Sequence, residues 1–128
     1  MTQEFEDRIT ELIGTPYDEN NFHCWTLVET LVPNAPKLDV QGGDFTRAAH
    51  QFKKEVPKYI EMYHEVLEDP QNFDIVLAGS KFLNHAGVLI IEDGNALVIH
   101  NDINGVHVEP LYFFRKKYPT IKVMRCLS

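Results

Sequence analysis

The feature that most constrains the fold is a pair of short apolar runs on either side of an Asp-Gly step. Residues 86–91 read Ala-Gly-Val-Leu-Ile-Ile, residues 96–99 read Ala-Leu-Val-Ile, and Glu-Asp-Gly-Asn separates them. Aliphatic and β-branched runs favour strands, and Asp-Gly is a strong signal for a two-residue hairpin turn. Because both faces of both runs are apolar, we predict a hairpin that is central in its sheet and covered on both sides.

The elements around this hairpin predict an α+β domain. Apolar residues at helical spacing predict helices over residues 3–13, from about Cys24 to Val32, over 45–68 with an interruption at Pro57, and near 111–118. Short β-branched runs predict further strands at 74–78, 106–108 and 121–124. Helices come first and an antiparallel sheet follows, which is the α+β order, and the length of 128 residues suits a single domain over residues 1–128.

Charge and hydropathy exclude several classes of function. The chain carries 19 acidic and 12 basic residues, a net charge of −7. A nucleic-acid partner is not expected, because binding to phosphates requires a clustered basic surface, and Arg115–Lys117 reads as a solvated helix face. No run predicts a membrane span, and the acidic start of the chain does not resemble a signal peptide. We therefore expect synthesis in the cytoplasm.

Two cysteines, Cys24 and Cys126, lie near opposite ends of the chain, and a disulfide between them is not expected in a cytoplasm. Cys24 lies at the first turn of a predicted helix, where the helix dipole and free N–H groups lower the pKa of a thiol and make it nucleophilic. The alternative interpretation is a small buried apolar residue on the helix's inner stripe. Cys126 is expected to be structural.

His85 begins the first strand of the hairpin and is the candidate base for Cys24, although a buried core histidine is the alternative. If Asp93-Gly94 is a two-residue hairpin loop, the residues that pair across the two strands have numbers that add up to 187. His85 then opposes Asp102, and His100 is its diagonal neighbour on the same face, within reach of a hydrogen bond. A three-residue loop would instead bring Asn101 opposite His85.

No pair of the remaining histidines has the local spacing of a zinc site, so neither a metal nor another cofactor is predicted. His50 and His64 lie in the predicted helical middle segment, and His107 lies on a later strand.

Five segments in order resemble the NlpC-type cell-wall cysteine peptidases, most of all their short phage-associated branch. They are Gly14-Thr-Pro-Tyr17 with Phe22-His-Cys-Trp-Thr-Leu-Val28, Asp74-Ile-Val-Leu77, His85-Ala-Gly-Val88, Val98-Ile-His100 and Gly105-Val-His-Val-Glu-Pro-Leu111. Together they span about residues 5 to 126. The chain departs from the family pattern at His23, where an acid is usual, and at Thr26, where glycine or serine is usual.

The resemblance implies a papain-like fold and hydrolysis of peptidoglycan stem peptides without a cofactor. It implies Cys24 as nucleophile, His85 as base, His100 as orienting residue and Tyr17 as a substrate-binding residue, with Asn101 or Asp102 as alternative orienting residues. Phage tail or delivery proteins are expected partners, with action at the cell wall or periplasm after delivery, or on the virion. The alternatives are a catalytically silent tail component, an injected antibacterial amidase and a thiol acyltransferase.

Overall fold

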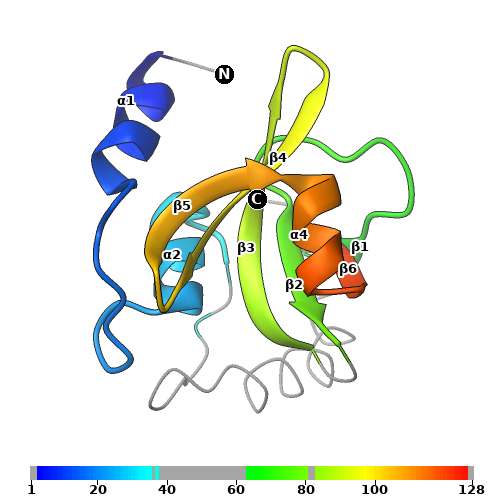
Figure 1. Cartoon of the computed structure of the whole chain (residues 1–128). Helices are drawn as coiled ribbons and strands as arrows, with labels where there is room; N and C mark the ends of the chain where they lie inside the picture. Colours follow the sequence, from blue (N-terminus) through cyan, green and yellow to red (C-terminus); the bar gives the residue numbers. More distant parts are fainter. Residues whose placement is uncertain (1–2, 36, 38–62, 81–82, 127–128) are drawn as a thin grey trace.

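The computed structural model describes residues 3–35, 37, 63–80 and 83–126. Two helices at the N-terminal end are followed by an antiparallel sheet, which confirms the α+β class (Figure 1). The elements, labelled as in Figure 1, are α1 Gln3–Leu12, α2 Cys24–Leu31, β1 Tyr63–Glu65, β2 Ile75–Gly79, β3 Leu83–Glu92, β4 Asn95–Asp102, β5 Gly105–Pro110, α4 Leu111–Lys117 and β6 Thr120–Cys126.

The sheet has six strands in the order β1-β6-β2-β3-β4-β5, and every neighbouring pair is antiparallel. The predicted hairpin, β3 and β4, is interior to this order, as expected. Helices α2 and α4 lie on opposite faces of the sheet, with α4 in front of the strands and α2 behind them in Figure 1.

The register of the β3–β4 hairpin is the one that the Asp-Gly step predicts. Glu92 pairs with Asn95 and Gly87 pairs with His100. Both turn residues have positive φ, 50° at Asp93 and 80° at Gly94, as a type I′ turn requires. Because side chains alternate across a strand, this register decides which residues of β4 share a face with His85.

Two apolar cores cover the two faces of the sheet. The larger core joins α1 and α2 to one face and includes Trp25, Leu27, Val28, Val88 and Ile99. The smaller core joins α4 to the other face through Phe114, which packs with Val76, Ala78, Leu89 and Val98. The alternate residues of β3 and β4 thus divide between the cores, as the apolar pattern on both faces of the hairpin predicts.

The segment after α1 is joined to the edge of the sheet. The Gly14 N–H donates to the Val106 carbonyl at 2.8 Å, and the Val106 N–H donates to the Thr15 carbonyl at 3.0 Å. Gly105 has φ +85°, and a Cβ there would lie 2.8 Å from the Thr15 oxygen, so glycine is needed at this crossing. These bonds hold the loop that precedes Cys24 against β5.

One prediction is wrong at its C-terminal end. The helix expected over 45–68 does not extend to Tyr63–Glu65, which form β1 and pair with β6, Tyr63 opposite Cys126. A free sheet edge on β6 offers backbone hydrogen bonds that override the local helical pattern. Residues 66–68 are not helical either, and the rest of the predicted helix, 45–62, lies outside the described residues. None of the helices in the described part of the chain is long and apolar enough to cross a membrane.

Candidate functional site

Cys24 is the first residue of α2, as predicted, and the turn before it is fixed on two sides. His23 is the N-cap residue of the helix, and its backbone N–H donates to the Thr26 hydroxyl at 3.5 Å. The Asn101 side-chain amide donates to the Phe22 carbonyl at 2.8 Å and ties the loop to β4. The two departures from the family pattern, His23 and Thr26, therefore lie together at the helix cap.

The Cys24 thiol is buried, with 3% of the residue exposed. N–H groups of Ala86, Trp25 and Cys24 itself lower its pKa, as expected at a helix start, but burial dominates and raises the pKa to about 12. The expectation of a lowered pKa is therefore wrong. In the resting protein Cys24 is a neutral thiol, because an apolar surrounding disfavours the thiolate more than three N–H groups stabilise it.

His85 lies near the start of β3, one residue before Ala86, whose N–H faces the Cys24 sulfur. Its ring stacks on Tyr118 at a centroid distance of 4.8 Å and on Phe114 at 6.1 Å. Burial raises the pKa of Tyr118, and the charges of Asp102 and Glu109 add to that rise, with a smaller contribution from Cys24. The thiol and the imidazole thus lie at the same end of β3, although no hydrogen bond joins them among the described residues.

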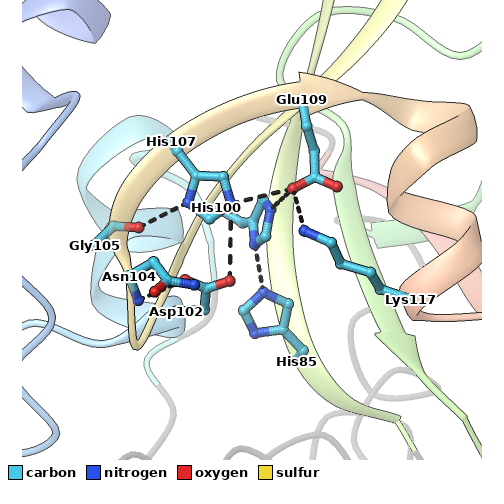
Figure 2. Close-up of polar contacts among 8 residues, drawn as sticks. All are labelled: His85, His100, Asp102, Asn104, Gly105, His107, Glu109 and Lys117. Atoms are coloured by element: carbon cyan, nitrogen blue, oxygen red, sulfur yellow. Dashed lines mark hydrogen bonds and ion pairs between the residues drawn. The ribbon is translucent and has the colours of Figure 1, made fainter.

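A chain of hydrogen bonds leads away from His85 (Figure 2). His85 Nε2 lies 2.8 Å from His100 Nδ1, and His100 Nε2 lies 3.0 Å from Glu109 Oε2. We call His85, His100 and Glu109 the histidine chain. Glu109 was not predicted as part of the site. A two-residue hairpin loop at 103–104 could have indicated Glu109. In the register that such a loop sets, Asp102 pairs with Gly105, His100 with His107 and Val98 with Glu109.

The carboxylate fixes the tautomers along the histidine chain. Because an ionised carboxylate only accepts, His100 donates from Nε2, and its Nδ1 then accepts from His85 Nε2. This leaves the lone pair of neutral His85 on Nδ1, and that nitrogen has no hydrogen-bond partner among the described residues. The histidine chain therefore ends in an unoccupied proton acceptor at the end of β3 where Cys24 lies.

Burial keeps both rings of the histidine chain neutral. It lowers the pKa of His85 to about 3, with a further contribution from the His100 charge, and it lowers the pKa of His100 against the opposing effect of Glu109. For Glu109, burial raises the pKa, but hydrogen bonds from His100 and Lys117 outweigh it and the net shift is downward. The carboxylate is therefore ionised and both imidazoles are neutral near pH 7.

The remaining predicted site residues are Tyr17, Asn101 and Asp102, and none of them has a hydrogen bond to His85 among the described residues. Burial raises the pKa of Tyr17, and a negative charge on Cys24 or Glu19 would add to that rise. Asn101 contacts the Phe22 carbonyl rather than His85. Asp102 accepts from the Asn104 N–H at 2.9 Å in the β4–β5 turn and also has no bond to His85. The structure therefore brings His100, and neither alternative, to His85.

Outside the histidine chain, His107 and Lys117 both contact Glu109 Oε2, at 3.1 and 2.9 Å. His107 Nε2 also lies 3.8 Å from Asp102 Oδ2. Potential ligand atoms of His100, Asp102 and His107 all lie within 4.8 Å of one another, a grouping that could hold a metal ion. The spacing of these residues along the sequence did not indicate a metal site, because the pairing of β4 with β5 is what brings their side chains together.

Two hollows at the surface lie away from Cys24 and His85. One of about 640 Å³ lies beside the β3–β4 turn and α4, and another of about 520 Å³ lies between α1 and the Asp74 end of β2. Neither is lined by a residue of the histidine chain. The chemistry of the site therefore depends on the buried groups described above rather than on these hollows.

No protein-family profile and no curated protein matches the sequence. A solved structure of an N-acetylmuramoyl-L-alanine amidase from Bacteroides uniformis ATCC 8492 is distantly similar, with 17% identity and a TM-score of 0.40. The similarity covers 80% of this chain and 56% of that one, so the chain spans about half the length of that amidase. The chemistry proposed below rests on the geometry of the site.

Proposed function

We propose that the protein is a cysteine hydrolase that cleaves peptide or amide bonds in peptidoglycan stem peptides. Cys24 is the nucleophile, His85 is the base, and His100 orients His85. The observation that carries this proposal is the order of hydrogen bonds from Glu109 through His100 to His85, which leaves a lone pair on His85 Nδ1. A base oriented in this way by a third group is what a cysteine nucleophile requires.

The reaction begins from a neutral pair, because burial raises the pKa of Cys24 to about 12 and lowers that of His85 to about 3. The Cys24 sulfur attacks the scissile carbonyl carbon as its proton passes to His85 Nδ1, and an S–C bond forms. The C–N bond then breaks, and His85 returns the proton to the leaving amine. Water, deprotonated by His85, hydrolyses the thioester and restores the thiol. Glu109 stabilises the positive charge on the histidines through His100.

The substrate class follows from the five ordered segments that resemble NlpC-type peptidases. Tyr17, in the loop before Cys24, is proposed to contact the stem peptide. We further propose that the protein acts at the cell wall or in the periplasm after delivery, or on a virion, with phage tail or delivery proteins as partners. An injected antibacterial amidase would use the same site.

Digestion of purified peptidoglycan, with the released fragments identified by mass, tests the proposal. We expect Cys24→Ala to release no fragments and to keep the thermal unfolding temperature of the unaltered protein. The matched control is Cys126→Ala, which removes the other thiol, in β6, and keeps the turnover rate of folded protein. Fragment release by Cys24→Ala at the full rate would exclude the mechanism.

A catalytically silent tail component is the second candidate, and the burial of Cys24 favours it. The thiol is 3% exposed and has no hydrogen bond to His85 among the described residues. If the unaltered protein releases no fragments from any peptidoglycan type while it binds purified tail proteins, this second function is supported and the first is excluded.

A further inference from the structure

His107, on β5, has one ring nitrogen against a carbonyl oxygen and the other against two carboxylates. Its Nδ1 lies 2.9 Å from the Gly105 carbonyl oxygen, so this nitrogen carries a proton and donates. In the neutral ring, Nε2 then carries a lone pair. That lone pair faces two carboxylate oxygens, Glu109 Oε2 at 3.1 Å and Asp102 Oδ2 at 3.8 Å (Figure 2). A lone pair against carboxylates is repulsive unless a proton or a metal cation lies between them.

The neighbouring groups are close to the separations that a metal ion needs. Ligand atoms of His100, Asp102 and His107 lie within 4.8 Å of one another. Zinc bonds of about 2.0–2.2 Å at tetrahedral angles place ligands about 3.3–3.6 Å apart, so small side-chain movements are enough. The side chains of His107 and Asp102 are 31% and 20% exposed, which gives an ion access from solvent.

Both histidines also have the outer hydrogen bond that metal-binding histidines use. A ligating imidazole almost always donates its second N–H to a carbonyl, a carboxylate or another acceptor, which fixes the ring. His107 donates to the Gly105 carbonyl, and His100 Nδ1 lies 2.8 Å from His85 Nε2. Each ring can therefore present Nε2 to one ion and keep its contact at Nδ1, while His100 gives up its hydrogen bond to Glu109.

We propose that His100, Asp102 and His107 bind a divalent transition-metal ion of the zinc class, with water completing the coordination. Two imidazoles and one carboxylate are the ligand types that zinc prefers over magnesium or calcium. The site is formed by the ends of β4 and β5 and shares His100 with the histidine chain.

The bound ion would prevent His85 from acting as a base and would inhibit the enzyme. This consequence rests on the proposed hydrolase function. With a metal on His100 Nε2, the proton of neutral His100 moves to Nδ1 and donates to His85 Nε2. His85 then carries its own proton on Nδ1 and cannot accept one from Cys24. Metal binding thus reverses both tautomers, and the resting thiol loses its base.

The binding test uses the full chain with both thiols replaced, Cys24→Ala and Cys126→Ala, so that sulfur ligands do not contribute. Titration with Co²⁺, followed by visible absorption, and with Zn²⁺, followed by calorimetry, should give one ion per chain. His107→Gln in this background should weaken binding by on the order of 100-fold. The control is His64→Gln, on β1 at the opposite edge of the sheet, which should bind as the parent does. Equal affinity in the two histidine variants, or no binding, would overturn the site.

Inhibition is measured separately on the protein with its thiols intact. Zinc at saturating concentration should stop fragment release, a chelator should restore it, and His107→Gln should stay active in zinc. Inhibition of His107→Gln as strong as that of the unaltered protein would overturn the inhibitory role of the ion. An inactive unaltered protein would refute the hydrolase, and the Co²⁺ and Zn²⁺ titrations would still decide the metal site.

Discussion

The sheet holds two buried polar clusters, and they differ in how completely their hydrogen bonds are satisfied. Asp74, 1% exposed, accepts from Arg125 Nε at 2.8 Å, from Arg125 Nη2 at 2.9 Å and from the Gln71 N–H at 2.8 Å. We call these three residues the ion-pair cluster. The histidine chain is instead open, because His85 Nδ1 has no partner among the described residues.

This difference separates a structural role from a chemical one. A buried carboxylate that accepts from an arginine at both oxygens and from a backbone N–H at one of them is occupied by these donors, and it serves to join β6 to the segment before β2. An imidazole nitrogen left without a partner, at the end of β3 that Cys24 also contacts, retains the capacity to take a proton. The following predictions test that distinction, from the largest expected effect on turnover to the smallest.

Removing the open end of the histidine chain should have the largest effect. We expect His85→Ala to lower the turnover rate by about a thousandfold or more, since the loss of a base in such a triad has effects of that order. The measurement is fragment release per folded molecule. His50→Ala is the control and should stay within about twofold. Equal losses in the two variants would mean that the histidines act through folding.

The burial of Cys24 predicts slow alkylation. A pKa of about 12 instead of 9 lowers the thiolate fraction near pH 7.5 by about a thousandfold, so iodoacetamide should modify Cys24 in the folded protein far more slowly than in denaturant. Because the pKa is raised, the rate should still be rising at pH 10. A rate that levels off below pH 8 would show a thiolate at rest and would contradict the neutral pair.

Within the histidine chain, the orienting residue should matter less than the base. His100→Ala should lower the turnover rate by about ten- to a hundredfold, because His85 loses the partner that fixes its tautomer. Asn101→Ala should instead destabilise the loop before Cys24 through its lost bond to Phe22, and affect turnover of folded protein less. A larger loss of turnover in the asparagine variant would refute the role of His100.

The ion-pair cluster should affect stability alone. Arg125→Ala leaves the Asp74 carboxylate buried with only a backbone donor, and we expect the free energy of unfolding to fall by about 2–3 kcal/mol, since the arginine is partly exposed. Denaturant titration measures this loss, while fragment release per folded molecule should not change. Arg115→Ala, at an exposed arginine of α4, should change stability by less than about 0.5 kcal/mol. Loss of turnover in Arg125→Ala would remove the distinction between the clusters.

The sequence by itself determined the local elements and the hairpin register, because both depend on short-range chemistry. Apolar periodicity placed α1, α2 and all strands except β1, and the Asp-Gly step fixed the pairing of Gly87 with His100. The same register predicted that His100, rather than Asn101, would lie on the face of His85. Local pattern failed at Tyr63–Glu65, where pairing with β6, about 60 residues away in the sequence, decided the structure.

Only the tertiary structure decided the electrostatics of the site. A helix start predicts a lowered thiol pKa, but the pKa of Cys24 is set by the core that α2 enters, and the cost of burying a charge exceeds the benefit of a few N–H groups. Likewise, Glu109 and His107 join His100 because β4 and β5 align side by side. Burial and cross-strand contact depend on residues distant in sequence, so no local pattern could have specified them.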